Sequence, residues 1–145
     1  MELKPGLQRT GVLDVEATRR QAEEAGFATF VLPAEGIVDE ASFYEAVRAT
    51  LPTDPPLVSP EELARTGGRL SRDALDDSLW EGLYTHPARR IAILWPKAGT
   101  MSSSSPSDFE IALSVLTDVA NLLADPRATV GKPKEVAVLV EDRTG

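Results

Sequence analysis

Apolar positions along the chain fall into three short continuous runs that are separated by longer periodic stretches. The runs are FATFVLP (27–33), RRIAILWP (89–96) and KEVAVLVED (134–142), and each is rich in β-branched or aromatic residues. This pattern is typical of strands that are covered on both faces. Proline lacks a backbone donor, so Pro33 and Pro96 mark where the first two strands stop pairing.

The periodic stretches predict four helices. They span residues 13–27, 39–51, 71–84 and 105–125. Gly26 is a suitable end for the first helix, and Asp39 or Ser42 can cap the second. The Ser-Pro-Ser-Asp sequence at 105–108 is a start signal for the last helix.

The predicted order is helix, strand, helix, helix, strand, helix, strand. Strands joined through helices form parallel sheets with right-handed connections. We therefore predict an α/β fold, a small three-layer domain with a three-stranded parallel sheet flanked by helices. Residues 27–145 are expected to form this domain and residues 1–26 an N-terminal helical extension of the same globular unit. Residues 52–68 and 97–108 are expected to be long irregular loops, which tend to be functional or mobile.

The length of 145 residues and the hydrophobic fraction of 42% suit a single packed core. The formal net charge of -8 argues against nonspecific binding to nucleic acid, whose phosphates require Lys and Arg. It favours a basic protein partner, because long-range fields steer opposite charges together. Solubility alone also explains an acidic charge, so the charge by itself does not decide between the two.

The chain contains no cysteine, which excludes disulfides and thiolate chemistry. No apolar run approaches the roughly 20 residues that span a bilayer, and residues 1–20 lack the apolar segment of a secretory signal. We therefore expect a cytoplasmic protein. The single histidine, His86, precedes Pro87 in a turn that ends a helix, and we expect no catalytic role for it. No cofactor or metal is expected.

Residues 71–84, SRDALDDSLWEGLY, combine four acids with two large aromatic residues. At 3.6 residues per turn, Leu75, Leu79 and Leu83 form the stripe that faces the core. The opposite side then carries Asp73, Asp77, Trp80 and Tyr84, flanked by Asp76 and Glu81.

Part of this pattern has a purely structural explanation. Ser71 suits an N-cap, and Asp73 in the first turn complements the helix dipole. Asp76 and Asp77 lie further in, and Asp73 and Asp77 repel each other one turn apart. The two aromatic side chains either join the exposed face or turn sideways into a neighbouring loop. Aromatic residues beside charges are typical of interface hot spots, so we interpret this face as a surface for a basic partner.

The stretch DALDDSL (73–79) resembles the recognition helix of the barstar-like family of intracellular ribonuclease inhibitors. The order of elements is similar as well: a strand, a helix around ASFYEAV, a loop, DALDDSL, a strand ending in Leu-Trp, a long helix and a last strand. IAILWPK is similar to the family's second strand and KEVAVLVED to its last. The similarity covers roughly residues 27–142.

This resemblance implies a protein inhibitor of a basic ribonuclease and no enzymatic activity. Asp73 and Asp77 match the two helix acids that occupy the enzyme's phosphate-binding site, and Asp118 is the candidate for a further acid from the long helix. The residues expected to contact the partner are Leu70, Arg72, Asp73, Asp76, Asp77, Trp80, Glu81 and Asp118. Direct contact with nucleic acid or a membrane is not expected.

Two alternatives stay open. The lead-in TGGRLSRD (66–73) departs from the family pattern, because it lacks an aromatic residue and places Arg72 directly before Asp73. A barstar-like interaction module with a non-nuclease basic partner is therefore one alternative. The other is an enzyme that binds Mg²⁺ through the helix acids. It is disfavoured, because acids on one short helix cannot surround a cation and the chain has no Walker-type phosphate loop.

Overall fold

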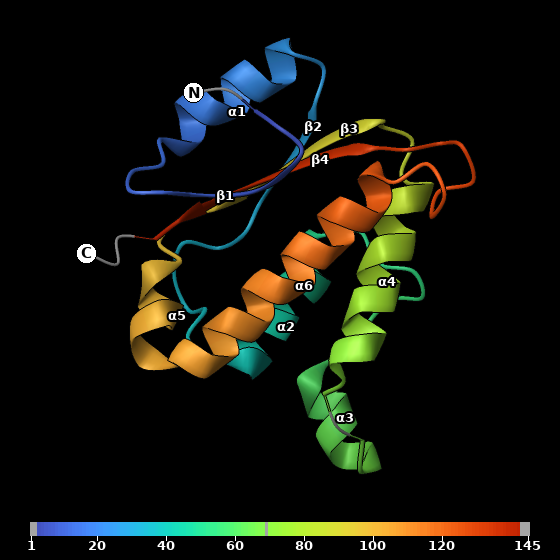
Figure 1. The fold of residues 1–145 in the computed structure, drawn as a ribbon. Coiled ribbons are helices and arrows are strands. Elements are labelled where there is room, and N and C mark those ends of the chain that lie inside the picture. Colours follow the sequence, from blue (N-terminus) through green and yellow to red (C-terminus); the bar gives the residue numbers. More distant parts are fainter. Residues whose placement is uncertain (1–2, 69, 143–145) are drawn as a thin grey trace.

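The computed structural model describes residues 3–68 and 70–142, and it contains a parallel sheet with the strand order β1-β4-β3-β2 (Figure 1). The strands are β1 (Gly6–Thr10), β2 (Ala28–Val31), β3 (Arg90–Trp95) and β4 (Glu135–Glu141). The helices are α1 (Val15–Glu24), α2 (Glu40–Thr50), α3 (Pro60–Thr66), α4 (Arg72–Thr85), α5 (Gly99–Ser104) and α6 (Pro106–Ala124). The predicted α/β class and parallel sheet are confirmed.

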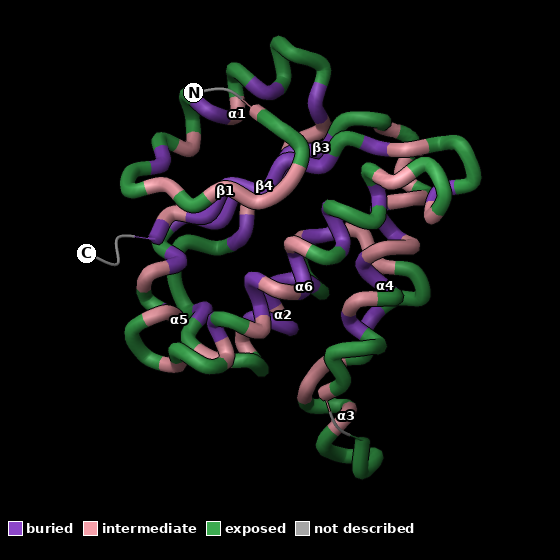
Figure 2. Tube along the Cα trace, viewed as in Figure 1, coloured by how far each residue is buried: buried purple, intermediate pink, exposed green. Residues whose placement is uncertain are grey.

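The sheet separates two cores of unequal size, because side chains alternate along each strand. Ile91, Ile93 and Trp95 of β3 enter the large core beneath α2, α4 and α6. Ala92 and Leu94 face the other way, into the small clusters beneath α1. Figure 1 shows α1 alone on one face of the sheet. Both inner strands, β3 and β4, are buried along almost their whole length (Figure 2).

The prediction of three strands was wrong, because the sheet has four. The additional strand, β1, lies in the segment expected to be only a helical extension. It pairs with β4 alone, so it is an edge strand, and its sequence GLQRT lacks the continuous apolar run of a central strand. An ion pair between Arg9 and Asp142 joins β1 to the residue after β4.

The four predicted helices are present, with ends shifted by one to three residues. Asp39 caps α2, and its carboxylate accepts from the Ser42 backbone N–H at 2.9 Å. The Ser42 hydroxyl accepts in turn from the Asp39 N–H at 3.0 Å, so both candidate residues take part in one reciprocal cap. Gly26 follows α1 with φ +87°, a left-handed conformation that glycine adopts without strain.

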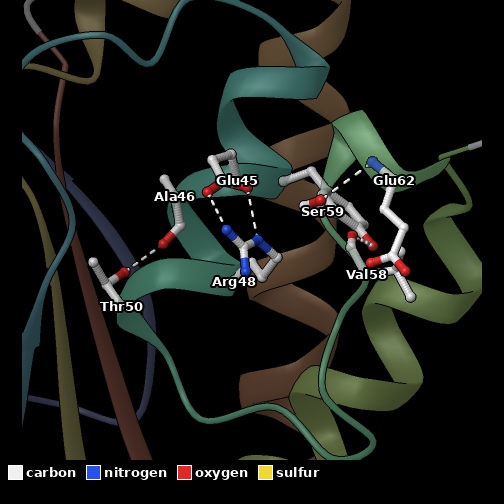
Figure 3. Close-up of polar contacts among 8 residues, drawn as sticks. Glu45, Ala46, Arg48, Thr50, Val58, Ser59 and Glu62 are labelled. Carbon is white, nitrogen blue, oxygen red and sulfur yellow. Dashed lines mark hydrogen bonds and ion pairs between the residues drawn. The ribbon is translucent and has the colours of Figure 1, made fainter. Parts of the chain in front are cut away.

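Each segment predicted to be an irregular loop contains a short helix. α3 begins after Ser59, whose hydroxyl accepts from the Glu62 N–H at 3.2 Å (Figure 3). The Tyr44 hydroxyl donates to the Val58 carbonyl at 2.8 Å and ties this segment to α2. α3 has no buried residue, whereas α5 is anchored by the fully buried Met101. None of the helices in residues 3–68 and 70–142 is long and apolar enough to cross a membrane.

Candidate partner-binding surface

The start of α4 and its leucine stripe determine which side of the helix meets solvent. The Ser71 hydroxyl accepts from the Ala74 N–H at 3.2 Å, so Ser71 is the predicted N-cap. Leu75, Leu79 and Leu83 are all buried in the large core. The predicted inward face is therefore confirmed, and the acids lie on the remaining surface of the helix.

The acids of α4 differ in exposure. Asp73 and Asp77 are exposed, one turn apart, whereas Asp76 and Glu81 are half-buried. No hydrogen bond or ion pair joins the Asp73 or Asp77 carboxylate to another residue in the described part of the chain. These two negative charges are therefore available to a partner.

Arg72 joins α4 to α6. Its guanidinium lies 3.1 Å from the Asp118 carboxylate on α6 and 3.8 Å from the Asp76 carboxylate on α4. The structure thus brings Asp118 beside the α4 acids, as expected from the sequence. Leu70 lines a small cavity of about 120 Å³ together with Arg72 and Tyr44, and none of Asp73, Asp76, Asp77 and Asp118 lines it.

A groove of about 890 Å³ crosses the outer surface of α4 and α6, and we call it the acidic groove. Its lining residues are Asp54, Pro55, Asp76, Asp77, Trp80, Glu81, Asp118, Val119, Asn121, Leu122 and Ala128. Five of these residues are acids, and none of the described lining residues is basic. Five of the eight residues expected to contact a partner line this groove: Asp76, Asp77, Trp80, Glu81 and Asp118. Leu70, Arg72 and Asp73 do not line it.

Asp76 is the acid whose protonation the groove perturbs. Burial raises the pKa of its carboxyl, Arg72 opposes that shift, and the negative charges of Asp118, Asp73 and Asp77 add to it. One carboxyl oxygen, Oδ1, is buried and accepts no hydrogen bond from the described residues. Asp76 therefore keeps its proton to a higher pH than an exposed aspartate does.

The two aromatic residues of α4 have different surroundings. Trp80 and Tyr84 stack with ring centroids 4.8 Å apart and an interplanar angle of 18°. The Tyr84 hydroxyl donates to the Thr129 carbonyl at 2.9 Å, so Tyr84 turns sideways toward the loop after α6. Trp80 lines the acidic groove. Tyr84 thus turns sideways into a neighbouring loop, whereas Trp80 belongs to the surface that carries the acids.

The sequence did not predict the other lining residues of the groove, which are Asp54, Pro55, Val119, Asn121, Leu122 and Ala128. Gly82 was the signal for the loop that contains Asp54 and Pro55. A β-carbon at Gly82 would overlap the Pro52 carbonyl and lie 2.5 Å from the Thr53 nitrogen, so only glycine lets the loop cross α4 here. The Asp54 N–H donates to the Ser78 carbonyl at 2.9 Å and fixes the crossing.

Two further features of the structure concern metal binding and the single histidine. In residues 3–68 and 70–142, no three acidic or histidine side chains are grouped to hold a metal ion. His86 lies at the C-terminal end of α4, where its Nδ1 accepts from the Ala88 N–H at 3.1 Å. Burial, and then the charge of Lys134, lower the pKa of His86.

Comparison with known proteins identifies no relative. No family model matches the chain, and no curated protein or solved structure is significantly similar to it. The function therefore has to be inferred from the chemistry of the surface.

Proposed function

We propose that this protein binds a small basic ribonuclease and blocks its active site with the acidic side of α4. The observation that supports this proposal is the placement of Asp73 and Asp77, which are exposed one turn apart and make no ion pair within the described residues. An active site that holds RNA phosphate with Arg, Lys and His also accepts carboxylates at a similar spacing. The resemblance of DALDDSL to the recognition helix of barstar-like inhibitors agrees with this role.

The physical setting of these acids favours binding to a cationic cleft. The buried leucine stripe holds α4 rigidly, so the carboxylates are presented with little loss of conformational entropy. The net charge of -8 attracts a basic protein from a distance and accelerates association at low ionic strength. Glu81 and Asp118 extend the negative surface on either side of Asp77.

Calorimetric titration against a small basic microbial ribonuclease, together with an inhibition assay, tests the proposal. We expect a 1:1 complex whose affinity falls about tenfold or more in Asp77→Asn, because the carboxylate is expected at the centre of the contact. Glu24→Gln is the matched control: it also removes one negative charge, but from the exposed side of α1 on the opposite face of the sheet. Equal effects of the two substitutions would place the contact elsewhere.

A basic partner that is not a nuclease is the second candidate. The observation that favours it is Arg72, which directly precedes Asp73 and places a cation against Asp76 and Asp118. This arrangement neutralises part of the surface that would meet the ribonuclease. If no ribonuclease binds while other basic proteins do so in an Asp77-dependent manner, this second candidate replaces the first.

A further inference from the structure

The acidic groove has an apolar floor that the charges of α4 do not explain. Trp80, Val119 and Ala128 contribute to this floor together with Pro55 and Leu122. Leu122 is 48% exposed, although it belongs to the helix that packs across the core of the sheet. A partner side chain that covers Leu122 removes this apolar surface from water, which favours binding.

The groove is preformed, because both of its walls are fastened to α4. On one side the loop at residues 52–55 crosses α4 at Gly82 and is held by the hydrogen bond from Asp54 to Ser78. On the other side the loop after α6 is held by the Tyr84–Thr129 hydrogen bond. Trp80 stacks on the same tyrosine, so its ring has little freedom to close over the floor. A ligand that enters the groove therefore meets a fixed shape and loses little affinity to reorganisation.

The lining chemistry defines the occupant. Carboxylates border an apolar floor, and none of the described lining residues is basic. Phosphate-rich ligands and anionic lipid surfaces are repelled by such a rim, and so is a second copy of this acidic chain. A leucine-sized or aromatic side chain flanked by Lys or Arg matches both features at once.

We propose that the acidic groove binds one large apolar side chain of the partner, carried on a segment with Lys or Arg on both sides of it. This inference rests on the basic partner of the proposed function and adds an anchor that the exposed acids do not provide. The apolar side chain lies against Leu122 and Trp80, and the flanking cations meet Asp77 and Asp118 at the rim. The apolar anchor selects among basic partners, because every basic partner satisfies the acids but only some carry the anchor.

Two short synthetic peptides test this assignment without a ribonuclease. One carries Leu between two pairs of Lys, and the other has Ser in place of Leu. Trp80 fluorescence reports binding, because the other tryptophan, Trp95, is 1% exposed in the core. We expect the Leu peptide to bind about tenfold more tightly than the Ser peptide.

The substitution Leu122→Ser sharpens the test. It is expected to lower the affinity for the Leu peptide to that for the Ser peptide and to leave the affinity for the Ser peptide unchanged. Val12→Ser is the matched control, since Val12 is also an exposed apolar residue but is not part of the groove lining. Equal binding of the two peptides, or equal effects of the two substitutions, would overturn the assignment. A ribonuclease that fails to bind would remove the proposed function alone, and Leu-dependent peptide binding would still support the groove.

Discussion

Charge is used in opposite ways at the acidic groove and at the C-terminal end of α4. Asp77 in the groove and Asp73 one turn before it on α4 are exposed and have no hydrogen-bond or ion-pair partner in the described part of the chain. At the end of α4, Lys134 is 8% exposed, and its ammonium donates to three backbone carbonyls. These acceptors are Leu83 at 2.8 Å, Ala88 at 2.9 Å and His86.

The difference separates structural charges from available ones. Three donors of Lys134 meet three acceptors at the negative end of the helix dipole, so the fold satisfies every hydrogen-bond donor of this ammonium. Asp73 and Asp77 instead repel each other, and their carboxylates accept no hydrogen bond from the described residues. When the fold leaves a charge without a partner beside exposed apolar surface, a binding protein can supply the opposite charge and the hydrogen-bond donors.

The largest effect on stability is expected from Lys134→Met. The substitution keeps an unbranched side chain of similar length but leaves the carbonyls of Leu83, His86 and Ala88 without their donor. We expect the free energy of unfolding to fall by about 3 kcal/mol, measured by urea denaturation. Lys132→Met is the matched control, because Lys132 is exposed, and it should change stability by less than about 0.5 kcal/mol. Similar losses in both variants would show that Lys134 is not a structural cation.

Gly82→Ala should damage both stability and the groove. The added methyl group overlaps the backbone of Pro52 and Thr53, which cannot yield as a flexible side chain would. We expect a loss of about 2 kcal/mol in unfolding free energy and greater quenching of Trp80 fluorescence by acrylamide, as the loop lifts from α4. Gly11→Ala serves as the control, since a β-carbon there meets nothing within 4 Å. Unchanged quenching in Gly82→Ala would mean that the loop does not form a wall of the groove.

Asp76→Asn tests the electrostatics of the groove through pH. The folded-state pKa of Asp76 is raised above its ordinary value of 3.8, so between 3.8 and that raised pKa the folded protein binds more protons than the unfolded chain. The stability contribution of Asp76 therefore falls as pH rises through this window. Asn removes that penalty, so the variant should be more stable than the native protein near neutral pH, by less than about 1 kcal/mol.

Urea denaturation from pH 7 down to pH 3 measures this difference, which should shrink toward the acidic end. Asp77→Asn is the comparison, because Asp77 is exposed on the same helix. If the stability advantage of Asp76→Asn persisted unchanged below pH 3.8, protonation of Asp76 would not be its cause.

Local patterns were enough to predict the elements around the core. The continuous runs of β3 and β4 and the leucine stripe of α4 carry their periodicity within a few residues. β1 was missed because an edge strand is only half-buried and needs no apolar run. α3 was missed because it buries no residue, and its signals are confined to the Ser59 cap and the proline that follows it.

The candidate surface could be predicted only in part, because local patterns show the exposed side of one helix but not contacts between distant segments. The exposure of Asp73 and Asp77 follows from the phase of Leu75, Leu79 and Leu83 on one helix. The groove depends instead on contacts between distant segments, where the loop at 52–55 crosses α4 and Asp118 approaches from α6. A single sequence without these contacts shows which acids are exposed but not the apolar floor between them.

The smallest effect on stability is expected from Arg72→Gln, which nevertheless acts directly on the charge of the groove. Arg72 and Asp118 are solvent-exposed, and the half-buried Asp76 is 3.8 Å from the guanidinium, so loss of both ion pairs should cost less than about 0.5 kcal/mol. Because Arg72 lowers the pKa of Asp76, its removal should raise that pKa further, which carboxyl NMR titration measures. The surface also becomes more negative, so association with the proposed partner, a basic ribonuclease, should accelerate about twofold at low salt. Arg20→Gln removes the same charge from the exposed side of α1 and should accelerate association less. Slower association in Arg72→Gln alone would mean that Arg72 itself contacts the partner or holds Asp118 in position for it.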